Sequence, residues 1–282
     1  PGQVGALIVA GNKTVIKSGT YTMSNTGNVS GGKIDVSIGA SGTNRPLWLG
    51  YQTIPTDGGT KPILRPSAAS VTLMTLTGAN NTVKNLEFQA NGQTGCVGVA
   101  IQSTNEHVED CKFNGISTAI SGVFNTSSSV KRCFATGITG SSAFDFSSGS
   151  SNVLMLDCVV ADSTNSGGAF NGMLPCIRCV ADTMTGDGFA NSTNGLAVYI
   201  NCVAYSCSSE GFTTIGYQAI AINCIAEACT TGFSGSTGEL GNQFLSYCAG
   251  FNNTTNVLAT AFSAGENKNF VTLTATPFTN AA

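Results

Sequence analysis

An all-β fold is predicted by the composition of the chain, by a repeat of nearly constant length and by the polar stretches that separate its apolar segments. Only 10% of the 282 residues are charged, whereas an ordinary globular domain has about 25%. The chain contains 35 glycines and is rich in Ser, Thr, Asn and Val, a mixture that favours strands and turns over helices. Because 41% of the residues are hydrophobic, the chain is able to bury a core.

The repeat is marked by cysteines. Seven of the 11 cysteines follow one another at intervals of 22, 25, 21, 23, 22 and 24 residues. About ten residues after each of the first six there is an Ala or Gly followed by Ile or Phe, as in Ala119-Ile120 and Gly211-Phe212. A unit of this length cannot bury its own apolar face, so successive units must stack. The repeated cysteines are Cys111, Cys133, Cys158, Cys179, Cys202, Cys224 and Cys248.

Stacking of such units predicts a parallel β-helix with about 22–23 residues per coil. Neighbouring strands lie about 4.8 Å apart, so the cysteines would form one inner column and the Ile and Phe residues a second. The Leu-x-x-Leu-x-Leu pattern of leucine-rich repeats and the six-residue spacing of left-handed hexapeptide helices are both absent. We expect an N-terminal cap and entry coils in residues 1–60, regular coils in 61–251 and a closing segment in 252–282.

The sequence resembles a known superfamily over nearly its whole length. The segments of the form Val/Ile-x-Asn-Cys … Gly-Phe/Ile between Val83 and Phe251 are similar to the coils of the pectate-lyase-like superfamily of right-handed parallel β-helices. The segment 11–21 resembles the first coil of many members, and 45–51 with 61–65 resembles the passage that follows it. The resemblance implies an all-β, right-handed parallel β-helix of the phage tailspike or surface-protein type. It leaves the function open, because this scaffold supports lyases, hydrolases, epimerases, tailspikes and adhesins.

The catalytic motifs that the superfamily implies are mostly missing. Polygalacturonases carry Asp-Asp, Gly-His-Gly and Arg-x-Lys, and none of these occurs in this chain. Pectate lyases use a carboxylate-bound Ca²⁺, an Arg base and a Trp-Ile-Asp-His-type segment. The single histidine, His107, lacks that context and is expected at the surface where a strand begins. The sequence therefore does not predict one of the catalytic activities known in this superfamily. It does not predict a bound metal or another cofactor either.

The few carboxylates gather on neighbouring coils. Asp187 and Glu210 each lie two residues before a Phe of the second column, so adjacent coils would place them about 5 Å apart, near the carboxyl spacing of retaining glycosidases. Asp182 and Glu227 each lie three residues after a repeated cysteine, with Tyr205 at the same position on the coil between them. These four acids are candidate catalytic residues, and a Ca²⁺ site among them is a further alternative. A solvated acidic patch at the coil corners is the other interpretation.

Three tyrosines on the same coils are candidates for stacking on sugar rings. They are Tyr199, Tyr205 and Tyr217.

The residue before each repeated cysteine is expected on the outer face, because side chains alternate along a strand. Acidic and basic residues alternate at this position before two asparagines, which avoids repulsion between like charges on neighbouring coils. An ionic track for a ligand is the alternative interpretation. The six residues are Asp110, Arg132, Asp157, Arg178, Asn201 and Asn223.

The cysteines are predicted to be reduced and structural. An inward thiol behaves as a small hydrophobe, and Cys207 and Cys229, 22 residues apart, indicate a second partial column. The thiols of Cys176 and Cys179 would point to opposite sides of an extended chain, which disfavours redox or zinc chemistry. Reduced thiols suit folding in a reducing compartment. A virion component made in bacterial cytosol would combine such folding with work at the extracellular or virion surface.

Three functions follow as hypotheses. The first is a phage-fibre-like, tailspike-like or bacterial surface module that contacts a polysaccharide or a cell-surface glycan. The second is a polysaccharide lyase or glycoside hydrolase that uses the acidic patch. The third is a structural subunit that self-associates as a homotrimer or end to end. A nucleic-acid partner is not predicted, because the net charge is −3 and the 12 Lys and Arg are scattered. A membrane span is not predicted either, since no apolar run approaches about 18 residues.

Overall fold

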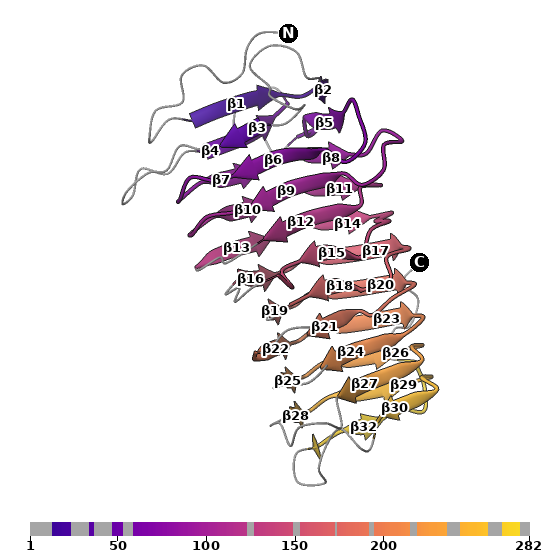
Figure 1. Cartoon of the computed structure of the whole chain (residues 1–282). Helices are drawn as coiled ribbons and strands as arrows, with labels where there is room; N and C mark the ends of the chain where they lie inside the picture. The colour runs from indigo at the N-terminus through magenta and orange to yellow at the C-terminus, as the bar shows by residue number, and fades with distance from the viewer. Residues whose placement is uncertain are drawn as a thin grey trace.

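The described part of the chain is a right-handed parallel β-helix. Its strands form three long parallel sheets around one axis, and each coil contributes a strand to sheet A, then to sheet B, then to sheet C (Figure 1). The ranges described contain no helix that is long and apolar enough to cross a membrane. The computed structural model describes residues 13–23, 34–36, 47–52, 59–122, 127–148, 153–172, 174–191, 195–214, 219–235, 243–258 and 267–276.

All strand pairs are parallel, and each strand pairs with the strands three before and three after it in the chain. Sheet A consists of β1 (Lys13–Lys17), β4 (Leu47–Tyr51), β7 (Thr82–Lys84), β10 (His107–Glu109), β13 (Ser128–Lys131), β16 (Val153–Leu156), β19 (Pro175–Ile177), β22 (Ala197–Ile200), β25 (Ala219–Ile222), β28 (Gln243–Ser246) and β31 (Asn267–Lys268). Sheet B consists of β2 (Thr20–Met23), β5 (Ile63–Pro66), β8 (Glu87–Gln89), β11 (Lys112–Asn114), β14 (Phe134–Thr136), β17 (Val159–Ser163), β20 (Val180–Met184), β23 (Val203–Cys207), β26 (Ile225–Glu227), β29 (Ala249–Phe251) and β32 (Val271–Thr272). Sheet C consists of β3 (Ile34–Val36), β6 (Thr72–Leu76), β9 (Val97–Ile101), β12 (Thr118–Gly122), β15 (Ser142–Asp145), β18 (Gly168–Asn171), β21 (Phe189–Asn191), β24 (Glu210–Thr214), β27 (Thr231–Gly235) and β30 (Thr255–Val257).

The corner between sheets A and B is a tight turn through a left-handed residue. The residue before each repeated cysteine has a φ of 51° to 56°, for example Asp110 and Arg132. Its side chain points outward for this reason, and not because side chains alternate along a strand as the sequence argument assumed. Asn tolerates this conformation best among non-glycine residues, which accounts for Asn85, Asn201 and Asn223 at the same position.

The seven repeated cysteines follow these corner residues and are all buried. They lie in register on successive coils, because the residue after each cysteine donates its backbone N–H to the carbonyl of the cysteine one coil earlier. Phe134 donates to Cys111 and Val159 to Cys133 in this way, at 3.0 and 2.9 Å. The column therefore fills the inside of the A/B corner with side chains of equal size.

Phenylalanines form the inner wall of sheet C. Phe144, Phe170, Phe189, Phe212 and Phe233 occupy one register position on successive strands. Their ring centroids are 5.3, 4.8, 4.7 and 4.9 Å apart, and all four pairs are stacked. The stack extends over five coils and includes Phe189 and Phe212, which lie two residues after Asp187 and Glu210.

Candidate functional site

Asp187 and Glu210 come together at the corner that leads from sheet B into sheet C. They lie one coil apart, because Phe189 pairs in register with Phe212. Each acid lies two residues before one of these phenylalanines. Asp187 accepts a hydrogen bond from the backbone N–H of Glu210 at 3.1 Å. The Thr213 hydroxyl donates to Glu210 Oε2. Thr213 was missed from the sequence because threonine is too common in this chain to stand out.

Asp187 lies in surroundings that favour its neutral form. Burial raises the pKa of Asp187 above its usual range, and the nearby charge of Glu210 raises it further, against hydrogen bonds from Ser209 and Thr213. A carboxyl whose pKa is raised, beside a second carboxyl, is the pairing that a general acid and a base or nucleophile require.

Asp182, Tyr205 and Glu227 form a second column on the outer face of sheet B. Asp182 pairs in register with Tyr205, and Tyr205 pairs with Glu227. Tyr205 is 38% exposed, and Asp182 Oδ1 accepts a hydrogen bond from the Thr183 hydroxyl at 2.9 Å. An exposed ring with a carboxylate one coil away forms a flat surface with hydrogen-bond acceptors at its side.

Glu227 is not on the open surface. It is only 5% exposed, because the closing segment folds back and Thr276 donates its hydroxyl to Glu227 Oε1 at 2.6 Å. Glu227 Oε2 has no hydrogen-bond partner within the described ranges. The patch expected from the sequence is thus open at Asp182 and Tyr205 and covered at Glu227.

The interpretation of Tyr199 as a sugar-stacking residue is wrong. Tyr199 is 1% exposed and its ring lies 5.4 Å from that of Phe189 and 5.6 Å from that of Phe212. Register places it between Cys176 and Ala221 in an inward column, and these small neighbours leave room for the ring. Burial raises the pKa of its hydroxyl well above the usual range. Tyr217 lies outside the described residues.

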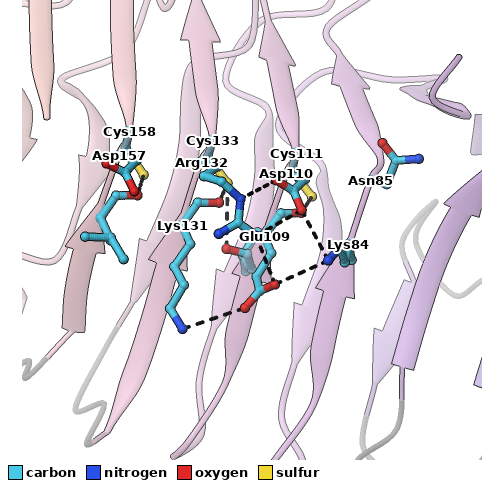
Figure 2. A network of polar contacts seen from close by, with 12 residues as sticks. Lys84, Asn85, Glu109, Asp110, Cys111, Lys131, Arg132, Cys133, Asp157 and Cys158 are labelled. Atoms are coloured by element: carbon cyan, nitrogen blue, oxygen red, sulfur yellow. Dashed lines mark hydrogen bonds and ion pairs between the residues drawn. The ribbon is translucent and has the colours of Figure 1, made fainter. Parts of the chain in front are cut away.

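The corner residues form ion pairs along the outside of the A/B corner. Arg132 contacts both Asp110 oxygens, at 2.7 and 3.1 Å, and Lys84 Nζ lies 3.3 Å from Asp110 Oδ2. Figure 2 shows these side chains reaching across neighbouring strands. Hydrogen bonding to Arg132 lowers the pKa of Asp110. The acidic side chains of this column are therefore paired with basic side chains on the neighbouring coils. Few of its charges remain unpaired and available to a ligand.

The column continues with Arg178, which contacts both oxygens of Asp157 at 2.6 and 2.9 Å. Beyond it, Asn223 Nδ2 donates to Asn201 Oδ1 at 2.7 Å. His107, the single histidine, is half-buried on β10, and its Nδ1 lies 2.7 Å from the Ser129 hydroxyl.

All 11 cysteines are free and buried. Burial raises the pKa of Cys133, Cys179 and Cys224 well above the usual range, so these thiols stay protonated. In the part of the chain that the structure describes, no group of three or more His, Cys, Asp or Glu is arranged to hold a metal ion.

Comparison with known proteins concerns the fold. The structure is similar to that of a rhamnogalacturonan lyase, with a TM-score of 0.61 and 13% identity, over 94% of this chain and 78% of that chain. The chain shares the fold of that lyase. At this identity the likeness shows a shared fold and not a shared activity.

Other comparisons are weaker. The pectate lyase Pel9A has a TM-score of 0.49 and 14% identity, over 97% of this chain and 74% of that one. ORF18 of Geobacillus virus E2 has a TM-score of 0.48 and 8% identity, over 87% of this chain and 54% of that one. No protein-family model matches the sequence. No curated protein matches it either.

Proposed function

We propose that this β-helix is a glycan-contacting module of the tailspike or bacterial surface-protein type, working at the extracellular or virion surface without the catalytic motifs of its fold relatives. The observation that carries the proposal is the exposed ring of Tyr205, in register with Asp182 on the outer face of sheet B. An aromatic face buries the apolar face of a sugar ring, while a neighbouring carboxylate accepts hydrogen bonds from its hydroxyls.

The closing segment gives this surface a boundary. Thr276 covers Glu227, one coil beyond Tyr205, so a sugar stacked on the Tyr205 ring would not reach the Glu227 carboxylate. Val203 on the same strand is half-buried, which adds apolar surface next to the ring.

The proposed location rests on the cysteines. Eleven free, buried thiols suit a protein that folds in a reducing compartment. Once folded, the thiols are shielded from oxidants by the packed interior, so the same protein can work outside the cell. A virion component follows this route.

Replacement of Tyr205 tests the proposal. Tyr205→Ala should weaken retention on an immobilised polysaccharide about five- to tenfold, since an aromatic contact contributes about 1 kcal/mol. Tyr247→Ala is the matched control, because Tyr247 is 65% exposed but lies at the A/B corner. Equal retention of Tyr205→Ala and wild type, or no retention of wild type on any polysaccharide of a broad panel, would contradict the proposal.

A second candidate function is glycoside hydrolysis by Asp187 and Glu210. It is favoured by the raised pKa of Asp187 beside Glu210. Asp187 would donate its proton to the leaving glycosidic oxygen, and Glu210 would attack the anomeric carbon or deprotonate water. Glu210→Ala should abolish release of reducing sugar from a cleaved polysaccharide. Unchanged release by this variant would exclude the assignment.

A further inference from the structure

A groove of about 360 Å³ lies at the B/C corner of the coils that contain β8, β11 and β14. None of its nine lining residues is charged, and most of its side chains carry amides or hydroxyls. Asn91 and Gln93 line it from one coil, Asn114 from the next and Thr139 from the one after. This groove contains none of the residues discussed above.

Of the four amide side chains that line the groove, that of Gln89 is already hydrogen-bonded to Arg65 and Glu87. Within the described ranges, no hydrogen bond involves the side chains of Asn91, Gln93 or Asn114. Elsewhere, asparagine amides are used to hold the coils together. Asn85 Nδ2 donates to the Gly50 carbonyl at 2.8 Å, and Asn253 Nδ2 donates to the Ala226 carbonyl at 2.9 Å. The amides of Asn91, Gln93 and Asn114 are therefore free to bind a ligand.

Two glycines keep the groove open. Gly92 and Gly115 have φ values of 77° and 66°, and a Cβ added to either would meet nothing within 4 Å. Any side chain at these positions would be strained and would project into open space. The absence of side chains there gives a ligand access to the backbone.

The backbone that presents the amides is held in place by inter-coil hydrogen bonds. Ala90 N–H donates to the Asn114 carbonyl at 3.1 Å, and Gly115 N–H donates to the Thr136 carbonyl at 2.9 Å. The Gln93 N–H closes its own turn on the Ala90 carbonyl at 3.0 Å. Because the backbone is already ordered, only the amide side chains lose conformational entropy when a ligand binds.

We propose that this groove binds an uncharged oligosaccharide, about two rings long. Each amide offers two donors and an acceptor, and sugar hydroxyls both donate and accept, so the two sets complement one another. The three coils that line the groove span about 10 Å along the axis, which sets the length of the ligand. This inference rests on the proposal that the chain contacts glycans, and it names an additional site and the class of sugar that the site takes.

The lack of charge selects against acidic sugars. A carboxylate or sulfate in the groove would lose hydration without gaining an opposite charge. Arg65, on β5, contacts a groove residue, since its Nε and Nη2 both donate to Gln89 Oε1, at 2.9 and 2.6 Å. These donors are already used and are not offered to an acidic sugar.

Calorimetric titration of the whole chain with neutral and acidic trisaccharides tests the inference. Maltotriose, cellotriose and mannotriose are the neutral probes, and trigalacturonate is the acidic one. We expect at least one neutral probe to bind, with the same affinity in 50 and 500 mM NaCl because neither partner is charged. The double variant Gln93→Ala/Asn114→Ala should raise the Kd for that probe at least tenfold. Gln102→Ala is the matched control, an exposed amide on the same coil but outside the groove, and it should leave the Kd unchanged.

Three results would overturn the inference. They are no binding of any neutral probe to the wild type at 10 mM, an unchanged Kd in the double variant whose unfolding midpoint matches wild type, and binding of trigalacturonate alone. Failure here is distinguishable from failure of the proposed function. Polysaccharide retention that depends on Tyr205 but not on the groove residues would leave the proposed function standing and remove only this site.

Discussion

Removal of the Phe189 ring should destabilise the middle of the β-helix far more than removal of an exposed phenylalanine. The Phe189 ring stacks on Phe170 at 4.8 Å and on Phe212 at 4.7 Å, and it contacts the tilted ring of Tyr199 at 5.4 Å. Phe189 is fully buried. Its replacement by Ala therefore deletes the centre of the stack and leaves a cavity between two rings.

The expected magnitude follows from these contacts. A buried Phe→Ala substitution costs about 3–5 kcal/mol through lost transfer free energy and the residual cavity. Loss of two stacked partners and one tilted partner, each contributing about 0.5–1.5 kcal/mol, places Phe189→Ala near the upper end, at about 4–5 kcal/mol. Phe134→Ala is the matched control, since Phe134 is 38% exposed on the outer face of sheet B, and its loss should cost about 1 kcal/mol.

Urea unfolding measures both free energies, and amide hydrogen exchange shows where the effect lies. Because each coil contacts only its neighbours, loss of protection should be greatest on β18, β21 and β24 and small on β5 and β8. Equal destabilisation by the two substitutions would refute the reasoning, as would a cost below about 2 kcal/mol for Phe189→Ala.

Other outcomes follow from charges, thiols and assembly. The raised pKa of Asp187 makes the free energy of unfolding fall as the pH rises through that pKa. Asp187→Asn should therefore match wild type in this free energy at pH 3.5 and exceed it at pH 7.5, by about 1.4 kcal/mol for every tenfold change in proton affinity, as measured by urea unfolding at both pH values. Arg132→Asp would stack three carboxylates with Asp110 and Asp157 and should cost about 1–2 kcal/mol at low salt, less in 1 M NaCl; equal loss at both salt concentrations would contradict this. Ellman's reagent should titrate no thiol rapidly in the native protein and all 11 in guanidinium; fast native reaction would refute the burial. Light scattering after size exclusion tests the predicted homotrimer or end-to-end assembly, and a monomer at high concentration would contradict both.

The coil architecture was predictable because it depends on a repeated local pattern. One inward cysteine and one inward Phe per coil are enough to define the register, since neighbouring coils must place like residues above one another. The charge column was predictable for the same reason, and Asp110 does pair with Arg132 one coil away. The backbone conformation of this column was not predictable from alternation along a strand. Its residues lie at a corner and have left-handed φ values.

Tyr199 shows a signal that was present in the sequence and was not used. It lies three residues before Cys202, as Val108 lies before Cys111 and Leu245 before Cys248. That position is buried on every coil from β4 to β28, and Tyr199 fits there because Cys176 and Ala221 on either side are small. The repeat, applied to this position, would have placed the ring in the core.

The sequence by itself determined the coil length, the inward columns and the adjacency of Asp187 to Glu210, because each depends on periodicity alone. Only the tertiary structure decided which acids are accessible. Glu227 is covered by Thr276, 49 residues further along the chain, and the path of a closing segment has no periodicity to reveal it. The amide groove likewise depends on which side chains find partners across coils. Whether a side chain finds a hydrogen-bond partner depends on the packing of the whole molecule. Residues as common as Asn91 and Asn114 can therefore be recognised as candidates for ligand binding only in the structure.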